Sequence, residues 1–270
     1  MCFCDHAADI NNGGLVNRLA VVTGALSGLG KATCAALEAD GDRVIRVDIA
    51  ASDVNANLAT ADGRQYAVDQ IAKLAGDHID SIITWAGGGG GTLDLLRVNY
   101  FGTVDIVEGL RPLLTRSAAP RVLVTTSRMS LEPADSHLVD LLLSHSEAEI
   151  LAGYGDETVP MSYYITAKTA VARWMRRNAV APRWNAHSIR INALAPGLIE
   201  TERTSKGMLD PTTAAWMIAA HPQAEDVRSR AEEIGELARF LVSPQNSLLI
   251  GQCIFADRGT QAILRGDGIW

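Results

Sequence analysis

A tyrosine and a lysine four positions apart are the side chains of this sequence best suited to chemistry. Tyr164 and Lys168 lie in a helix-forming stretch, so their spacing places the phenol and the ammonium on one helix face. A cation at ~4 Å, at an effective dielectric constant of ~20, favours the phenolate by about 4 kcal/mol. The pair therefore predicts a general acid/base, Tyr164, whose pKa Lys168 lowers. Tyr163 is the alternative, but its five-residue offset turns it toward another face.

A serine follows an apolar run that is predicted to be a buried strand. Ser127 comes two positions after residues 121–125. Because the carboxyl ends of strands line the ligand crevice of an open α/β sheet, we expect its hydroxyl to hold a substrate oxygen. Thr126 and Ser130 are alternatives at similar depth, and any of the three could instead cap a helix or a turn.

A glycine-rich turn separates the first predicted strand from the first predicted helix. Its first glycine permits a tight turn, the second lets the backbone approach a diphosphate, and the third lets helix and strand pack closely. A flexible turn without a ligand is the alternative. The predicted contacts to a dinucleotide are Gly24, Ser27, Gly28, Leu29 and Gly30.

An aspartate ends the second predicted strand. Asp48 lies eighteen positions after Gly30, where a carboxylate can accept hydrogen bonds from the adenosine ribose of NAD. It would repel the 2′-phosphate of NADP, and its neighbour Ile49 carries no compensating charge. Arg46 could supply such a charge, and Asp48 could also be a solvated strand end. The sequence predicts NAD in preference to NADP.

Short apolar runs alternate with helical periodicity along the whole chain. This alternation predicts an α/β Rossmann fold, a doubly wound parallel sheet with helices on both faces. The predicted strands are residues 18–23, 43–48, 81–85, 121–125 and 188–193, and the predicted helices are residues 31–39, 69–75 and 95–114.

A long segment, residues 131–160, separates Ser127 from Tyr164. Its leucine-rich stretch, residues 138–143, predicts a short amphipathic helix over the edge of the sheet. A length of 270 residues suits one α/β domain. We therefore expect a flexible N-terminal extension, residues 1–17, and one NAD-binding domain, residues 18–270, that contains this insertion.

Composition and charge exclude several classes of partner. A formal net charge of −7 opposes binding to nucleic acid or to an anionic membrane, and no apolar run suits a signal peptide or a membrane span. The four cysteines lack the spacing of zinc sites or disulfide frameworks, so we expect a cytoplasmic protein without a metal. Cys2, Cys4 and His6 could form part of a metal site, but a frayed tail is the expectation.

These motifs together resemble the short-chain dehydrogenase/reductase family, from about residue 18 to residue 262. The active-site serine segment of the family matches the run ending at Ser127, its asparagine segment matches Val98 to Gly102, and its tyrosine-lysine pair matches Tyr164 and Lys168. The resemblance implies that Tyr164 is the acid/base, that Ser127 orients the carbonyl, that Lys168 binds the nicotinamide ribose, and that Asn99 holds a water in a proton relay.

The resemblance also implies further cofactor contacts. The segment Ile191 to Gly197, together with Thr201, is similar to the part of the family that contacts the nicotinamide, and residues 251–259 resemble its last strand and turn. The residues implied are Asn57, Leu58, Ala86, Gly87, Pro196, Gly197, Ile199 and Thr201.

Three departures from the family pattern accompany this resemblance. Thr84 and Trp85 replace two asparagines, Asn57 replaces an aspartate beside the adenine, and thirty-six residues separate Ser127 from Tyr164. The long insertion is most similar to the branch that contains bacterial 3α-hydroxysteroid dehydrogenase/carbonyl reductase. In that branch the insertion covers a helix face used for tetramer formation, so we expect a homo-oligomer, a dimer before a tetramer.

The leading hypothesis is an NAD-dependent oxidoreductase that interconverts a secondary alcohol and a ketone. The leucine-rich insertion favours a bulky, apolar, alicyclic or steroid-like small molecule, although it could equally pack a sheet edge or a subunit interface. A catalytically silent NAD(H)-binding regulator is the alternative on the same fold. A methyltransferase would leave the spacing of Tyr164 and Lys168 unexplained.

Overall fold

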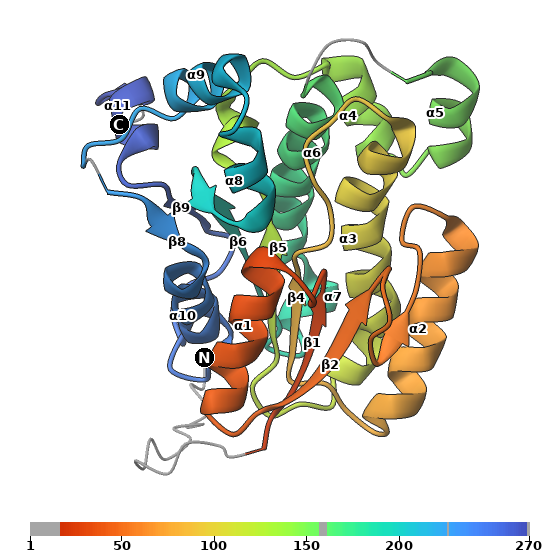
Figure 1. Cartoon of the computed structure of the whole chain (residues 1–270). Coiled ribbons are helices and arrows are strands. Elements are labelled where there is room, and N and C mark those ends of the chain that lie inside the picture. Colours follow the sequence, from red (N-terminus) through yellow and green to blue (C-terminus); the bar gives the residue numbers. More distant parts are fainter. Residues whose placement is uncertain (1–16, 157–160, 226, 269–270) are drawn as a thin grey trace.

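A seven-stranded parallel sheet forms the centre of the molecule in the computed structural model, which describes residues 17–156, 161–225 and 227–268 (Figure 1). The strand order reverses between β1 (Leu19–Thr23) and β4 (Ser81–Thr84), so the carboxyl ends of these two neighbouring strands mark the switch point of the sheet. In spatial order the strands are β3 (Val54–Asn55), β2 (Arg43–Asp48), β1 (Leu19–Thr23), β4 (Ser81–Thr84), β5 (Arg121–Thr125), β6 (Arg190–Pro196) and β9 (Cys253–Ala256).

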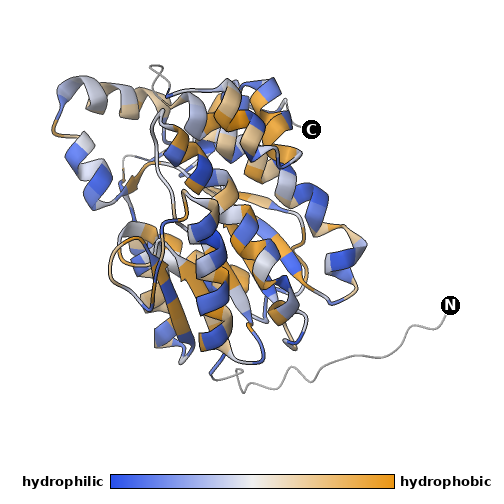
Figure 2. Cartoon of the chain, turned by 90° about the vertical axis from the view of Figure 1, so that its right-hand side faces the viewer, coloured by the Kyte–Doolittle hydropathy of each residue, from blue (hydrophilic) through white to orange (hydrophobic). Residues whose placement is uncertain are grey.

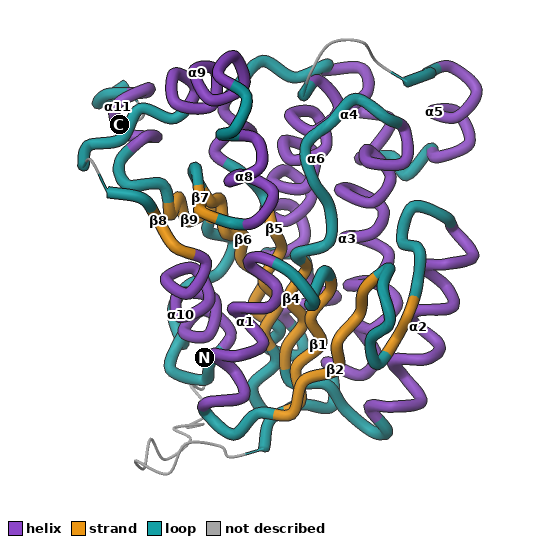
Figure 3. Tube along the Cα trace, viewed as in Figure 1, coloured by secondary structure: helices purple, strands orange, loops and turns teal. Residues whose placement is uncertain are grey.

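Helices cover both faces of this sheet, as predicted for a doubly wound fold (Figures 1 and 3). One face carries α1 (Gly28–Ala39) and α10 (Ala231–Val242), and the other carries α2 (Ala61–Ala75), α3 (Leu93–Leu114) and α6 (Ser162–Ala179). The shorter elements are η1 (Arg128–Leu131), α4 (Ser136–Leu143), α5 (Glu147–Gly153), α7 (Pro182–Asn185), β7 (Ile199–Glu200), α8 (Glu202–Gly207), α9 (Pro211–Ala220), β8 (Ser229–Arg230) and α11 (Thr260–Arg265).

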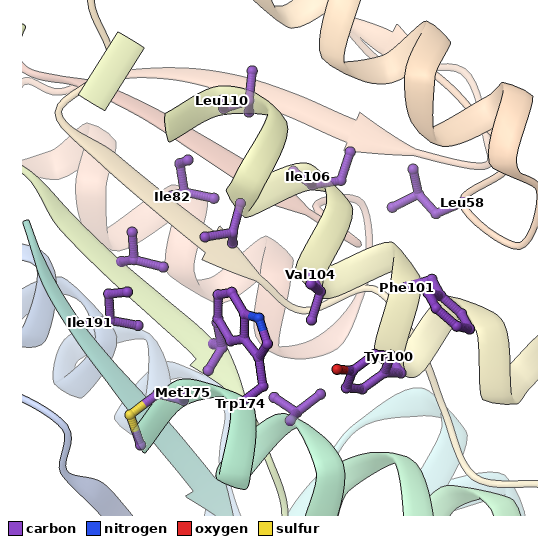
Figure 4. Close-up of a cluster of buried hydrophobic side chains, with 14 of the residues drawn as sticks. Leu58, Ile82, Tyr100, Phe101, Val104, Ile106, Leu110, Trp174, Met175 and Ile191 are labelled. Atoms are coloured by element: carbon purple, nitrogen blue, oxygen red, sulfur yellow. The ribbon is translucent and has the colours of Figure 1, made fainter. Parts of the chain in front are cut away.

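Two hydrophobic clusters, one on each face, hold these layers together. Every residue of β1 and β5 is buried, as expected for strands covered on both sides. Figure 4 shows the larger cluster, in which Trp174 of α6 and Leu110 of α3 lie over Ile82 and Ile191 of the sheet. The hydrophobic residues gather between the layers, and the outer helix faces are mostly hydrophilic (Figure 2). None of the described helices is long and apolar enough to cross a bilayer.

The predicted strands and helices are present, with differences at their ends. The strands over residues 43–48 and 121–125 have the predicted bounds. Helix α2 begins eight residues before the predicted start, because the side chain of Thr60 caps it by accepting a hydrogen bond from the Gly63 amide at 3.0 Å. The N-terminal residues Cys2, Cys4 and His6 lie outside the described residues, so the extension and its boundary stay predictions.

The insertion forms two helices, α4 and α5, and the prediction that it covers the edge of the sheet is wrong. The edges are β3 and β9, whereas β5, which precedes the insertion, is an inner strand. Helix α4 instead packs on α6, with Leu138, Val139 and Leu142 fully buried in the larger cluster. The apolar face of this helix is therefore buried within the chain.

A buried arginine ties the insertion to the rest of the domain. Arg64 of α2, only 2% exposed in its side chain, pairs with Asp105 of α3 at 2.6 Å and with Glu147 of α5. Arg97 of α3 also pairs with Glu147, at 2.7 Å. Because one carboxylate bridges two guanidinium groups from separate helices, α5 is held against α2 and α3.

Candidate active site

The predicted site residues meet at the carboxyl ends of the parallel strands. Gly24 follows β1, Asp48 ends β2, Ala86 follows β4, Ser127 follows β5 and Gly197 follows β6. Since these strands are parallel, their carboxyl ends lie on the same side. The topology therefore brings together segments that are far apart in the sequence.

Ser127, Tyr164 and Lys168 form one cluster at the carboxyl ends of the strands. The Ser127 side chain is hydrogen-bonded to Tyr164 and also accepts a hydrogen bond from the Met129 amide at 3.1 Å. Lys168 donates to the carbonyl oxygen of Thr125 at 3.0 Å, and its Nζ lies 5.7 Å from the centroid of the Tyr164 ring. A hydroxyl pair next to a buried ammonium can hold a substrate oxygen and move a proton to it.

The protonation equilibria of this cluster differ from the sequence expectation. Burial raises the pKa of Tyr164, whereas the hydrogen bond with Ser127 and the charges of Arg203 and Arg128 act in the opposite direction. Burial also lowers the pKa of Lys168 to about 7. The expected lowering of the Tyr164 pKa is therefore absent, because loss of hydration outweighs the neighbouring charges.

The three alternative hydroxyl groups point elsewhere. Tyr163 is buried and donates to the carbonyl oxygen of Gly155. Ser130 donates to the backbone carbonyl of Ser127 at 2.7 Å, and the Thr126 hydroxyl lies 3.5 Å from the sulfur of Cys253. The geometry thus favours Tyr164 and Ser127 over these neighbours.

Asn99 of α3 holds the glycine run that follows β4. Its Nδ2 donates to the carbonyl oxygens of Gly88 and Leu95, at 2.8 and 2.7 Å, and its Oδ1 accepts from the Gly88 amide at 3.3 Å. Gly87 has a φ of +138°, and a Cβ there would lie 2.3 Å from the same Oδ1. The side chain therefore positions this run, and the predicted relay water stays a prediction.

The glycine-rich turn packs closely against the start of α1. A Cβ on Gly30 would lie 2.0 Å from the carbonyl oxygen of Gly24, so only glycine permits this packing. The side chain of Ser27 makes no capping hydrogen bond, and the first turn of α1, from Gly28, contains no acidic residue. The free amides and positive end of α1, beside Leu29, are thus available to a diphosphate.

Asp48 is fixed at the edge of this turn. Its Oδ2 accepts from the Leu26 amide at 3.1 Å and its Oδ1 from the Ala50 amide at 3.2 Å. The adjacent Ile49 is 70% exposed, so an adenosine can approach the strand end. Arg46, which could have compensated a 2′-phosphate, pairs instead with Glu38 of α1.

Asn57 and Leu58 differ in what they can offer to an adenine. Asn57 is exposed, and its Oδ1 accepts from the Ala59 amide at 3.0 Å. Leu58 is 5% exposed and packs into the larger cluster near Gly102 of α3 (Figure 4). Leu58 could therefore contact a cofactor only through its backbone.

The segment after β6 lies next to the glycine-rich turn. Gly197, next to Pro196, packs so closely on Asp257 that a Cβ would lie 2.9 Å from its Cα. Ile199 is buried, and Thr201 caps α8 by accepting from the Thr204 amide at 3.3 Å. A Cβ on Gly28 would lie 3.4 Å from the methyl of Thr201, so this segment faces the glycine-rich turn.

Comparison with known proteins identifies the family. The chain is 30% identical over 252 residues to 3-alpha-hydroxysteroid dehydrogenase/carbonyl reductase of Comamonas testosteroni, covering 91% of this chain and 97% of that protein. The chain belongs to the short-chain dehydrogenase/reductase family. Residues 142–261 also match a family model described as enoyl-(acyl carrier protein) reductase.

Two further similar proteins support the assignment of the chain to the short-chain dehydrogenase/reductases. Cis-4-hydroxycyclohexanecarboxylate dehydrogenase of Sinomonas cyclohexanicum is 30% identical over 255 residues, covering 91% of this chain and 97% of that protein. The 3-alpha-hydroxysteroid dehydrogenase of Pseudomonas sp. B-0831, solved with NADH, superposes with a TM-score of 0.84 at 29% identity, covering 92% and 99% of the two chains. The protein is an oxidoreductase of alcohols and ketones that uses a nicotinamide cofactor.

Two residues of this short-chain dehydrogenase/reductase contact the segments around the candidate site, although the sequence did not predict them as site residues. Trp85 donates from Nε1 to the Thr33 hydroxyl at 2.9 Å, which fixes α1 to the segment after β4. Arg203 of α8 reaches the carbonyl oxygen of Gly87 at 3.5 Å. Its position two residues after Thr201 was the one available signal.

Proposed function

We propose that this protein is an NAD-dependent dehydrogenase/reductase that interconverts a secondary alcohol and a ketone on a bulky, apolar, alicyclic or steroid-like molecule. The observation that carries the proposal is the cluster of Ser127, Tyr164 and Lys168 beside the glycine-rich turn. The four residues assigned to catalysis are these three and Asn99.

The proposed reaction divides its work between the cofactor and the side chains. When bound, the nicotinamide supplies a hydride to the carbonyl carbon or removes one from the alcohol carbon. In reduction, Ser127 donates a hydrogen bond to the substrate oxygen, and Tyr164 transfers its hydroxyl proton to that oxygen. In oxidation, Tyr164 receives the proton. Lys168 would hold the nicotinamide ribose.

The choice of NAD rests on the charge at the end of β2. The carboxylate of Asp48 is oriented by two backbone amides, and the nearest arginine, Arg46, is neutralised by Glu38. A 2′-phosphate near Asp48 would therefore meet a negative charge without a compensating cation. The hydroxyl groups of an adenosine ribose could instead donate to it.

The proposed substrate class is supported by relatives more than by the insertion. Leu138 and Leu142 are fully buried in a helix that packs on α6, so they are core residues and are not exposed to a substrate. Relatives at 30% identity have names that specify a hydroxysteroid and a hydroxycyclohexanecarboxylate, both alicyclic alcohols. We extend this substrate class to the present chain, in a cytoplasmic homo-oligomer.

Absorbance at the reduced-nicotinamide band tests this function. Purified protein is mixed with NAD or NADP and a panel of cyclic and steroid secondary alcohols. We expect turnover with NAD that falls roughly 10²- to 10⁴-fold in Tyr164→Phe. Tyr163→Phe is the matched control, since that hydroxyl bonds to Gly155 away from the cluster, and it should retain turnover.

Other outcomes would redirect the assignment. NADH binding without turnover of any alcohol or ketone would favour the silent regulator. Turnover of small polar alcohols alone would contradict the apolar substrate class while leaving the oxidoreductase assignment intact.

A further inference from the structure

Arg203 extends from α8 to the glycine run after β4. Its Nη1 lies 3.5 Å from the carbonyl oxygen of Gly87. A Cβ on Gly88 would lie 1.6 Å from the same Nη1, so the guanidinium rests on backbone that carries no side chain. This position depends on two elements that are distant in the sequence.

The two segments that Arg203 connects both lie next to the glycine-rich turn. On one side, Thr201 at the start of α8 faces Gly28 of the glycine-rich turn. On the other side, the backbone of Ala86 lies directly against Gly24, where a Cβ would be 2.7 Å from its amide nitrogen. The start of α8, which carries Arg203, is thus close to the start of α1.

The charge of Arg203 is not neutralised by the described part of the chain. Within these residues, the ion pair of α8 joins Lys206 to Glu202, and the hydrogen-bond acceptor of Arg203 is the Gly87 carbonyl at the limit of bonding distance. A guanidinium has five N–H donors in a fork that matches phosphate oxygens. Most of these donors are thus free to bind an anion.

The start of α1 balances only part of the negative charge of a diphosphate. The amides and dipole at the start of α1 are equivalent to roughly half a positive charge, whereas a diphosphate carries about two negative charges. A cation on the other side of the diphosphate would balance the remaining negative charge.

We propose that Arg203 binds the diphosphate of the dinucleotide by charge-assisted hydrogen bonds, from the side opposite α1. This inference rests on the proposed use of NAD(H). It assigns a cofactor-binding residue beyond the positions implied by the family pattern, and it gives α8 a direct part in cofactor affinity.

Calorimetric titration with NADH and with ADP-ribose tests the proposal. ADP-ribose retains the diphosphate but lacks the nicotinamide. We expect Arg203→Leu to weaken both ligands by a similar factor, about tenfold or more, and to reduce the dependence of the affinity on salt. Arg203→Lys, which keeps the charge but loses the fork, should lose less. Lys206→Leu, on the same helix and exposed, is the matched control and should leave both affinities unchanged.

Each contrary outcome has a distinct meaning. Unchanged affinities in a folded Arg203→Leu protein, judged by circular dichroism, would overturn the proposal, and Arg203→Gln replaces this variant if it does not fold. Weaker NADH with unchanged ADP-ribose would move the contact to the nicotinamide half and also overturn it. Unchanged cofactor affinity with a raised KM for carboxylate-bearing alcohols alone would assign Arg203 to the substrate. Failure of the wild-type protein to bind NADH would reject the proposed function itself.

Discussion

At the scale of single residues, the buried ammonium of Lys168 is the most unusual group of the site. Its one hydrogen-bond acceptor among the described residues is the Thr125 carbonyl, and burial lowers its pKa to about 7. The charged form is therefore costly in the folded protein. A bound nicotinamide ribose, as proposed, would add hydroxyl oxygens as further acceptors.

Lys168→Met should stabilise the protein in a pH-dependent way. Below pH 7 or so the folded wild type must keep a buried charge, whereas above the ordinary lysine pKa of 10.5 the side chain is neutral in both states. Between these values the unfolded chain binds more protons, so the free energy of unfolding of the wild type rises with pH. The increase in Tm caused by Lys168→Met should thus be larger near pH ~6 than near pH ~9.5. A pH-independent increase would contradict the lowered pKa.

Asp48→Asn should weaken the preference for NAD over NADP. The amide keeps the shape of the side chain but removes the charge that repels a 2′-phosphate. Because the site is partly exposed, solvent screening reduces the effect, and we expect the ratio of kcat/KM values to shift by roughly ten- to hundredfold toward NADP. Asp53→Asn, a nearby exposed carboxylate, is the control. An unchanged ratio would assign cofactor choice to another group.

At the scale of elements, the insertion depends on the ion pairs of α5. Glu147→Ala would remove one partner of the buried Arg64, although Asp105 would remain. We expect a loss of about 2 kcal/mol in the free energy of unfolding, measured by urea titration. Glu149→Ala, exposed on the same helix, should change it by less than about 0.5 kcal/mol. Equal effects would show that the network contributes little.

At the scale of the whole molecule, the insertion affects which surfaces remain for assembly. Helix α4 packs on α6, so part of this helix face is covered within the chain. We expect light scattering to give twice the chain mass of 28.8 kDa, a homodimer. A tetramer mass would indicate that α4 and α5 leave enough of the face free for a second interface.

The sequence by itself determined the features that depend on local patterns. Alternating apolar runs and helical periodicity predict the sheet and its helices, because burial on both faces leaves a pattern within each strand. Local geometry also suffices to predict the candidate site residues. One helix relates Tyr164 to Lys168, one turn contains the glycines, and one strand end carries Asp48.

Tertiary structure alone decided the features that depend on distant segments. The pKa of Tyr164 rises because burial in the folded chain removes its hydration, which a four-residue spacing does not reveal. The insertion lies on α6, where Leu138, Val139 and Leu142 join the larger hydrophobic cluster, a partner that the pattern within the segment does not specify. Arg203 meets Gly87 across 116 positions of sequence, since parallel strands bring their carboxyl ends together whatever their separation along the chain.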